Sequence, residues 1–298
     1  MNIKNNLKLI GNTPLVKIDL GIKNINVLAK LESYNLTGSI KDRMALYMVK
    51  KARKKGLLKP GYKVIEATTG NTGISLAALS RIFSYKFIAI MPEDVSIERA
   101  RMIRSFGAKV ILTPKKLGPK GAIDRRDQLA GKKSTIWVPM QFDNPDNIRS
   151  HEIGIAKEII AQTGGNIDYI VHGIGTGGTL MGVARAIKKV NLKTKIIAVE
   201  PKESAVLSGQ KAGQHGIQGI GEGFIPKLVN KNMIDQVVKV STKQAIWEAK
   251  NLANQGLFVG FSSGANISAI KQLISNISKP KNIVTIFADR GERYLSAI

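Results

Sequence analysis

The chain of 298 residues contains no cysteine. Disulfides, thiolate catalysis and any zinc or iron–sulfur site held by cysteine are therefore excluded. Only three histidines occur, His151, His172 and His215, and their wide separation along the chain argues against a histidine-rich metal site. We therefore expect no metal. The chemistry must come from lysine, hydroxyl or carboxylate side chains, or from an organic cofactor.

Long apolar runs are also absent. No uninterrupted run reaches the roughly 18–20 residues that a membrane-spanning helix needs. The first eight residues are polar and basic, and no apolar stretch with a cleavage site follows them, so they do not resemble a secretory signal. We therefore expect a soluble cytoplasmic protein that makes no contact with a membrane.

Acidic and aromatic residues are scarce. The 21 Asp and Glu residues face 46 Lys and Arg, which gives a net charge of +25. Such a charge attracts anions, and an anion-binding surface protein with steeply salt-dependent nucleic-acid binding is one alternative. Only 5% of residues are aromatic, which leaves little for base stacking. Because the basic residues are spread over many predicted helices, we expect solvated basic faces and no specific nucleic-acid binding.

What the chain does have is a regular alternation of apolar runs and helical periods. Continuously apolar runs such as 87–91, 169–174 and 283–288 are typical of buried parallel strands. Strands that alternate with helices predict doubly wound parallel sheets, with ligands held by the loops at the carboxyl ends of the strands. We predict an α/β fold with a smaller N-terminal domain at 36–145. The larger domain would combine 1–35 with 146–298, and the site would lie in the cleft between the two.

The first candidate motif is GSIKDR at 38–43, which leads into a predicted helix at 42–55. A lysine at a helix entrance lies near backbone N–H groups and the positive end of the helix dipole. That environment favours the neutral amine, the form that makes a Schiff base. Lys41 is therefore a candidate nucleophile. The alternative is an ordinary surface lysine.

The second motif is EATTGNTG at 66–73, between a predicted strand and a predicted helix. Its hydroxyl and amide side chains and its backbone N–H groups suit a carboxylate ligand. The alternative is that Asn71 or Thr72 only caps the helix.

Two further motifs lie in the second half of the chain. The glycine-rich turn GIGTGGT at 173–179 lets the backbone approach a small phosphate, although it is neither a Walker loop nor a dinucleotide fingerprint. A bare turn is the alternative. The segment GFSSGA at 260–265 offers two serines before a predicted helix at 266–274, and here helix capping is the alternative.

Together these motifs resemble the cysteine synthase (O-acetylserine sulfhydrylase) and cystathionine β-synthase family of fold-type II pyridoxal-phosphate enzymes. The resemblance runs from IGNTPL at 10–15 to DRGERYLS at 289–296 and covers nearly the whole chain. It implies a fold like that of the tryptophan synthase β subunit, with pyridoxal 5'-phosphate bound in the cleft between two parallel-sheet domains.

The resemblance also implies a role for each motif residue. Lys41 would hold the cofactor and move the Cα proton, Asn71 would bond the ring hydroxyl and Ser262 would meet the pyridine nitrogen. The cofactor phosphate would be bound by Gly175, Thr176, Gly177, Gly178 and Thr179. The substrate carboxylate would be bound by Thr68, Thr69, Asn71, Thr72 and Gln141.

The implied reaction is β-replacement: O-acetyl-L-serine and sulfide give L-cysteine through an aminoacrylate intermediate. A serine at the pyridine nitrogen does not hold it protonated, so the electron sink is weak and β-elimination is favoured. The resemblance further implies a homodimer that takes a small amino-acid substrate and sulfide. It also implies a serine acetyltransferase as a candidate partner, and a catalytically idle relative that only docks such a partner is another alternative.

The chain departs from the family pattern at three places. Thr69 replaces the usual serine, and the stretch 151–159 lacks the usual threonines and proline. Glu222 stands where many cysteine synthases carry a small residue. As a general base, Glu222 would make the enzyme a cysteine lyase or desulfhydrase that releases sulfide while water or another nucleophile adds. Otherwise Glu222 points to solvent or pairs with a lysine. Condensation of the cystathionine β-synthase type is a further alternative.

Overall fold

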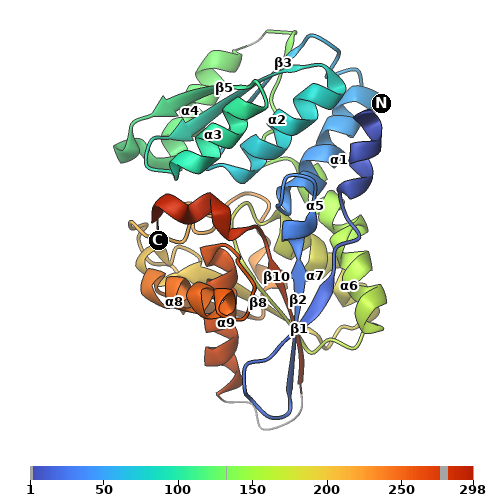
Figure 1. The fold of residues 1–298 in the computed structure, drawn as a ribbon, viewed down its shortest axis with the longest axis vertical. Coiled ribbons are helices and arrows are strands. Elements are labelled where there is room, and N and C mark those ends of the chain that lie inside the picture. Colours follow the sequence, from blue (N-terminus) through green and yellow to red (C-terminus); the bar gives the residue numbers. More distant parts are fainter. Residues whose placement is uncertain (1–2, 132, 276–280, 298) are drawn as a thin grey trace.

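The computed structural model describes residues 3–131, 133–275 and 281–297, which build two sheets stacked along the long axis of the molecule (Figure 1). The lower sheet has six strands in the order β1-β2-β10-β7-β8-β9, and the upper sheet has four in the order β5-β4-β3-β6. The six strands are β1 (Leu15–Ile18), β2 (Ile25–Leu31), β7 (Tyr169–Gly173), β8 (Lys195–Pro201), β9 (Gln236–Val240) and β10 (Lys281–Phe287). The four strands are β3 (Lys63–Ala67), β4 (Lys86–Pro92), β5 (Lys109–Thr113) and β6 (Ile136–Trp137).

Helices cover the faces of both sheets (Figure 1). Those of the first half are α1 (Lys41–Lys54), α2 (Asn71–Phe83), α3 (Ile97–Ser105) and α4 (Gly118–Ala130). Those of the second half are α5 (Pro145–Ile153), α6 (Ile155–Thr163), α7 (Gly178–Val190), α8 (Thr242–Ala253) and α9 (Phe261–Ile274). Short 3₁₀ turns are η1 (Ile3–Leu9), η2 (Glu32–Tyr34), η3 (Lys115–Leu117), η4 (Lys202–Ser204), η5 (Lys231–Met233) and η6 (Gly291–Ala297).

The predicted α/β class with parallel sheets is confirmed, with one exception at an edge. All strand pairs are parallel except β1 with β2, which are antiparallel. Strand β1 has only four residues and is joined to β2 by a short connection, which permits an antiparallel pair but not a parallel crossover. Strand β1 was not predicted from the sequence, and it adds one antiparallel edge to an otherwise parallel sheet.

The buried apolar residues form separate clusters around the two sheets. The six-stranded sheet has a cluster on each side, for example around Val199 and Ile270 on one and around Ile170 and Ile187 on the other. Separate clusters pack around the four-stranded sheet. Two cores with polar residues between them fit a molecule whose site lies between two sheets, although the exact domain limits stay a prediction.

One helix was missed and one predicted helix start was wrong, and both corrections concern the site. Helix α5 was not predicted, because it is short and begins at a proline, Pro145, at its first position. Helix α9 was predicted from 266 but begins at Phe261, with Gly260 as its N-cap. Serines and glycines have weak helix propensity, so the first turn of α9 looked like a loop in the sequence. Ser262 therefore lies in the first turn of a helix.

Candidate active site

One pocket collects residues from both sheets. Its lining comes from the segments that follow β3, β7, β8 and β10 and from the N-terminal ends of α1, α2 and α9. The lining residues are Lys41, Thr68, Thr69, Asn71, Thr72, Arg99, Gln141, Thr176, Gln218, Gly219, Glu222, Ser262, Ala288 and Asp289. The pocket is narrow, with a cavity volume of about 30 Å³, and it is partly open to solvent. It thus lies where a parallel α/β sheet normally binds its ligand.

Lys41 is the first residue of α1 and lines this pocket, so it is not an ordinary surface lysine. The backbone N–H of Ile40 donates to Ala288 O (2.8 Å), which joins the start of α1 to the end of β10. Among the described residues, no hydrogen bond or ion pair engages the Lys41 amine. Burial lowers the pKa of Lys41, and the positive charge of Arg99 acts in the same direction, while Asp289 and Glu222 oppose it. The environment therefore favours the neutral, nucleophilic amine.

In the turn after β3, neither Asn71 nor Thr72 caps the helix α2, contrary to the capping alternative. Thr68 Oγ1 accepts hydrogen bonds from the N–H groups of Gly70 (2.9 Å) and Gly73 (3.2 Å), and so serves the first turn of α2. The N-cap position itself is Gly70, with no side-chain cap. Asn71 and Thr72 are therefore free of capping and line the pocket. That alternative was wrong for these two residues, and the capping role belongs to Thr68.

Gln141 joins this turn from the segment before α5. Thr72 Oγ1 donates to Gln141 Oε1 (2.6 Å), and Gln141 Nε2 donates to Ala67 O (2.6 Å). All five residues predicted to bind a carboxylate thus line the pocket: Thr68, Thr69, Asn71, Thr72 and Gln141. A ligand carboxylate would have to exchange some of these internal hydrogen bonds for its own.

The glycine-rich turn forms a tight cup at the N-terminus of α7. A Cβ atom on Gly175 would lie 2.4 Å from Gly219 O, and one on Gly178 would lie 2.1 Å from Asn147 Oδ1. Gly177 caps α7 with a φ of +84°, a conformation that side chains disfavour. The glycines are needed for this close backbone packing. Thr176 lines the pocket, whereas Gly175, Gly177, Gly178 and Thr179 lie next to it in the chain without lining it.

Two residues that had no predicted role support this cup. Asn147 Nδ2 donates to Thr176 Oγ1 (3.0 Å) and to Gln141 O (2.9 Å). His151 Nε2 lies 3.4 Å from Thr179 Oγ1. Burial, with the nearby charges of Lys41 and Arg43, lowers the pKa of His151 well below its ordinary value, so the ring is neutral. Both residues come from α5, the helix that was not predicted.

Ser262 and Glu222 complete the predicted set. Ser262 lines the pocket from the first turn of α9, so the idea of an N-cap serine was wrong. Glu222 also lines the pocket, and no ion pair or hydrogen bond to its carboxylate occurs among the described residues. Burial raises the pKa of Glu222, while Lys41 and Arg99 oppose this. Glu222 therefore lines the pocket and is partly exposed there, and it pairs with no lysine among the described residues.

Three polar residues in the lining, Arg99, Gln218 and Asp289, had no predicted role. Arg99 is 1% exposed and lies on α3, where its Nη1 donates to Thr69 O (3.0 Å) and to Gln218 Oε1 (2.6 Å). Asp289 follows β10 and accepts from Asn71 Nδ2 (2.6 Å). Asp289 stands in the DRGERYLS segment that is part of the family resemblance, but no motif indicated Arg99 or Gln218. Only the fold brings them to the pocket.

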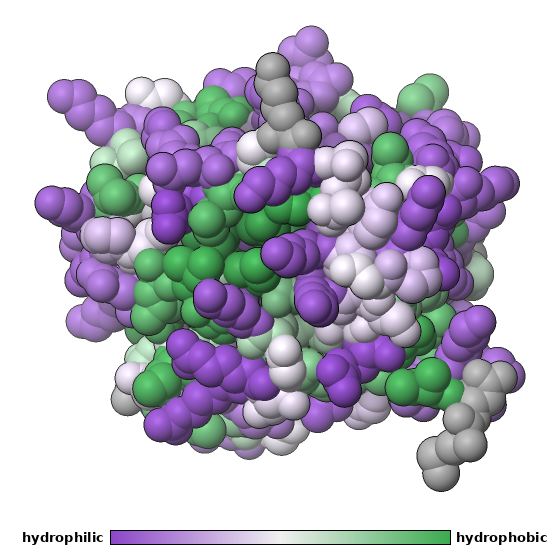
Figure 2. Space-filling view, turned by 90° about the horizontal axis from the view of Figure 1, so that it is seen from above, coloured by the Kyte–Doolittle hydropathy of each residue, from purple (hydrophilic) through white to green (hydrophobic). Residues whose placement is uncertain are grey.

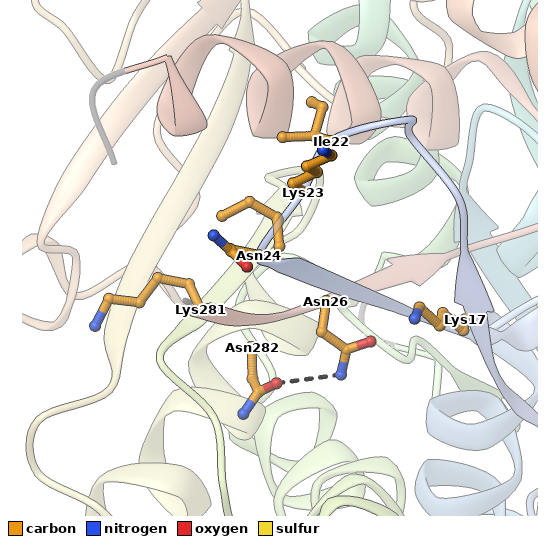
Figure 3. A pocket seen from close by; sticks show the side chains of 8 residues that line it. Lys17, Ile22, Lys23, Asn24, Asn26, Lys281 and Asn282 are labelled. Atoms are coloured by element: carbon orange, nitrogen blue, oxygen red, sulfur yellow. Dashed lines mark hydrogen bonds between the residues drawn. The ribbon is translucent and has the colours of Figure 1, made fainter. Parts of the chain in front are cut away.

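A second hollow lies at the opposite end of the six-stranded sheet (Figure 3). It is lined by Lys17, Ile22, Lys23, Asn24, Ile25, Asn26, Lys281 and Asn282, at the starts of the parallel strands β2 and β10. Asn26 and Asn282 bond each other (3.1 Å), as the dashed line in Figure 3 shows. Its lining has no hydroxyl or carboxylate side chain. The amino ends of parallel strands are also not where such sheets bind ligands.

Neither a metal site nor a membrane-spanning helix occurs in the described ranges 3–131, 133–275 and 281–297. They contain no group of three or more His, Asp or Glu side chains placed to hold a metal ion. None of their helices is both long and apolar enough to cross a bilayer.

Comparison with known proteins agrees with the pocket. Residues 7–289 match the family described as pyridoxal-phosphate dependent enzymes. The chain is 45% identical to cysteine synthase B of Campylobacter jejuni over 289 residues, which cover 97% of this chain and 96% of that one. Among solved structures, it superposes on a cysteine synthase of Entamoeba histolytica with a TM-score of 0.92 at 41% identity, covering 98% of this chain and 89% of that one. A hydrogen sulfide-producing enzyme of Fusobacterium nucleatum gives a TM-score of 0.93 at 42% identity, covering 99% and 90%.

Proposed function

Because the chain belongs to the family of pyridoxal-phosphate dependent enzymes, we propose that it forms L-cysteine from O-acetyl-L-serine and sulfide by β-replacement. The observation that carries this proposal is the single pocket in which Lys41, the asparagine turn, Thr176 and Ser262 meet. Its relatives named as cysteine synthases match it over nearly their whole length.

The residues present fit pyridoxal 5'-phosphate. Lys41 has an amine without a hydrogen-bond partner among the described residues, in surroundings that lower its pKa. Asn71 Oδ1 is buried and lacks a hydrogen-bond partner, so a ligand donor is missing there. Gly175, Gly177 and Gly178 leave no room for a Cβ atom. Their turn lies at the N-terminus of the 13-residue helix α7, and a helix N-terminus suits a phosphate.

We assign the following roles to the pocket residues. Lys41 Nζ attaches the cofactor, Asn71 meets its ring hydroxyl and Ser262 meets its pyridine nitrogen. Gly175, Thr176, Gly177, Gly178 and Thr179 hold the phosphate, with Asn147 and His151 supporting two of their hydroxyls. Thr68, Thr69, Asn71, Thr72 and Gln141 bind the substrate carboxylate through side chains and through the N–H groups at the start of α2.

The bound cofactor supplies an electron sink that makes the Cα proton of an amino acid acidic. Once the substrate's amino group has displaced Lys41 Nζ from the cofactor, the free Nζ would take that proton. The carboxylate-binding turn would keep the substrate's Cα within reach of Nζ. Acetate then leaves from Cβ, and sulfide attacks the same carbon. Lys41 Nζ returns its proton to Cα.

A paired assay tests this function. The purified protein is mixed with O-acetyl-L-serine and sulfide, and separately with L-cysteine alone, while the cofactor absorption is followed and the products are identified. We expect a cofactor band that changes with O-acetyl-L-serine alone and returns on addition of sulfide, with L-cysteine as product. A protein without any cofactor band would refute the proposal, and so would one that forms no cysteine.

A specific observation favours a second candidate function, the release of sulfide from cysteine. Glu222 places an unpaired carboxylate in the pocket, and a carboxylate with a raised pKa can act as a general base towards water. Water would then add at Cβ in place of sulfide and give serine. The similar enzyme of Fusobacterium nucleatum is named for hydrogen sulfide production.

Glu222→Gln tests this second candidate. Because the base must be ionised, sulfide release should rise with pH through the raised pKa of Glu222, above its ordinary 4.5. The variant should lose this rise and about 10²-fold in rate, while its cysteine synthesis changes little. Equal sulfide release by variant and wild type would remove the base role.

Adding homocysteine with O-acetyl-L-serine shows whether cystathionine forms as well.

We propose that the protein acts as a homodimer. An apolar area, green in Figure 2, lies on the face seen from above and is bordered by hydrophilic side chains. Leu112 and Leu117, about half exposed, line a groove between β5 and α4 on the four-stranded sheet side. Light scattering should give twice the chain mass, and Leu112→Asp should shift the protein towards the monomer. A monomeric wild type would refute the dimer.

We also propose a serine acetyltransferase as partner, whose C-terminal tail would enter the active-site pocket. Since the tail and the substrate would share this pocket, a peptide of the tail should compete with O-acetyl-L-serine. Inhibition that excess substrate does not relieve would contradict this partner.

A further inference from the structure

Asp289 is a buried carboxylate that the proposed chemistry does not use. It is 1% exposed and is the second residue after the end of β10. Its Oδ2 accepts hydrogen bonds from Asn71 Nδ2 (2.6 Å) and from Tyr294 Oη (2.8 Å). Arg99 Nη2 lies 3.8 Å from the same oxygen. One carboxylate oxygen thus joins residues of α2 and α3, beside the four-stranded sheet, to residues after the six-stranded sheet.

The backbone around Asp289 connects the same elements that carry the proposed cofactor contacts. Asp289 pairs with Ser39 in a β-bridge, and the neighbouring Ala288 accepts from the N–H of Ile40, directly before Lys41. Asp289 O accepts from the N–H of Gly260 (3.2 Å), the N-cap of the helix that carries Ser262. Asp289 is therefore fixed relative to the segments of Lys41 and Ser262, and its side chain reaches the third segment, that of Asn71.

The hydrogen bond between Asp289 and Asn71 decides which way the Asn71 amide faces. An amide nitrogen and an amide oxygen have nearly the same shape, so only hydrogen-bond partners distinguish the two orientations. Asp289 Oδ2 accepts from both Asn71 Nδ2 and Tyr294 Oη, so Asn71 presents its nitrogen to Asp289. Asn71 Oδ1 is left buried without a partner among the described residues. The orientation of the group that faces a ligand is thus set by Asp289.

We propose that Asp289 is a positioning residue that fixes the amide of Asn71 and thereby controls the protonation of the cofactor's ring hydroxyl. The inference rests on the proposed roles of Lys41 and Asn71. An amide that is free to turn offers the ring hydroxyl either its N–H donor or its oxygen acceptor. The donor stabilises the ionised hydroxyl, and the acceptor stabilises the neutral one. With Asp289 in place, the Asn71 amide presents only its oxygen to the ring hydroxyl. The ionised and neutral forms of the hydroxyl absorb at different wavelengths, so the spectrum reports this arrangement directly.

The test uses the holoenzyme and two variants of Asp289. Asp289→Asn keeps the shape, but its own amide can turn together with that of Asn71, and Asp289→Ala removes the acceptor. Both should change the ratio of the long- and short-wavelength cofactor bands, and the pH at which that ratio changes. Both should also weaken cofactor retention about tenfold, the order expected for one hydrogen bond to a charged group. Should the alanine variant fail to fold because Arg99 loses its partner, the asparagine variant carries the test.

Two controls separate positioning from a general effect. Tyr294→Phe removes the other donor to Asp289 Oδ2 and keeps the ring, so its spectrum should match the wild type. In an Asn71→Ala background, measured with saturating pyridoxal phosphate, Asp289→Asn should change nothing further, because Asp289 acts through Asn71. An unchanged spectrum in Asp289→Asn, or the same change with and without Asn71, would overturn the inference. A wild type that has no cofactor band would instead refute the proposed function.

Discussion

At the scale of single residues, the pocket contains two cations and two carboxylates whose surroundings differ. Arg99 lies 3.8 Å from Asp289, and both are 1% exposed. Lys41 and Glu222 have no such partner among the described residues. Burial lowers the pKa of Lys41 and raises that of Glu222, so both are shifted towards their neutral forms. Titratable groups shifted in this way inside a pocket are typical of reacting residues, whereas Arg99 and Asp289 hold the site together.

Replacing Lys41 should remove catalysis without removing the fold. Lys41→Ala loses both the attachment point of the cofactor and the group that moves the Cα proton. We expect cysteine formation to fall by at least about 10³-fold and the cofactor to wash out on gel filtration. Lys50→Ala is the matched control, since Lys50 is an exposed lysine of the same helix. A Lys41→Ala protein with more than a tenth of the wild-type rate would contradict the assignment.

At the scale of elements, the site depends on loops that come close to other backbone. The turn after β7 packs on the loop 219–223: the N–H of Gly221 donates to Ile174 O (3.0 Å), and Gly175 has no room for a Cβ. The start of α1 is held in another way, by buried charges. Arg43 contacts Glu32 (2.6 Å) and Glu158 of α6 (2.6 Å), and Lys30 of β2 also contacts Glu158 (2.8 Å).

The phosphate cup should not tolerate one added methyl group. In Gly175→Ala the Cβ would lie 2.4 Å from the backbone oxygen of Gly219, so the two loops must separate. We expect cofactor affinity to fall at least about tenfold, the loss of one charge-assisted hydrogen bond or more. Fluorescence titration with pyridoxal phosphate measures it. Gly164→Ala, where the added Cβ meets nothing within 4 Å, should cost about 1 kcal/mol of stability through its positive φ but leave that affinity unchanged. If both variants bound pyridoxal phosphate equally well, the cup would not be the phosphate site.

The charge network at α1 should make stability depend on acid pH. Burial acts to raise the pKa of Glu158, but the hydrogen bonds and charge of Arg43, with Lys30, hold it at about 2, below the ordinary 4.5. A lowered folded pKa means that this stabilisation is fully present above about pH 4.5 and is lost as the pH falls towards 2. Glu158→Gln should therefore unfold more easily at pH 7 by about 3 kcal/mol, because buried Lys30 loses its carboxylate partner and Arg43 keeps only Glu32. The difference from wild type should shrink below pH 4.5.

Urea unfolding between pH 2 and 7 measures this effect. Asp124→Asn is the control, since its pair with Lys120 is exposed and should matter far less. A Glu158→Gln penalty that stays constant across the whole pH range would mean that lost packing, not lost charge, causes it.

At the scale of the whole molecule, the site belongs to neither sheet alone. Lys41, Asn71 and Gln141 lie on the side of the four-stranded sheet, whereas Thr176, Ser262 and Asp289 follow elements of the six-stranded one. Contacts between η6 and α3 add to this junction, where Ser296 donates to Glu98 from its N–H and from its hydroxyl (both 2.8 Å). A cofactor bound between the sheets therefore contacts both and stabilises their arrangement.

Removing the cofactor should lower the melting temperature of the entire molecule. Ligand that binds only the folded state adds about 2.7 kcal/mol at a concentration of 100 Kd. For a chain of this size, that corresponds to about 5 to 10 °C. Calorimetry of cofactor-free protein with increasing pyridoxal phosphate measures the shift, and Lys41→Ala should show a much smaller one. Two transitions, of which only one moves, would show that the cofactor stabilises one sheet and not both.

The sequence by itself determined which chemistry the chain carries and in what order its parts occur. The lack of cysteine, the GSIKDR lysine, the asparagine turn and the glycine-rich turn are local patterns, and each needs only neighbouring residues to be recognised. The apolar strands predicted the parallel sheets for the same reason, because burial on both faces requires a continuous apolar run. The helix starts were less predictable, as α5 and the first turn of α9 show, since proline, serine and glycine give weak local signals.

Only the tertiary structure decided which polar atoms are available to a ligand. The sequence could not show that Thr68 Oγ1 serves the first turn of α2, or that Arg99 reaches Thr69 and Gln218. Asp289 lies 218 positions from Asn71 in the chain and yet fixes its amide. A buried hydrogen bond depends on donor and acceptor being brought within 3 Å at the right angle. That distance is set by how the two sheets pack, which no local pattern records.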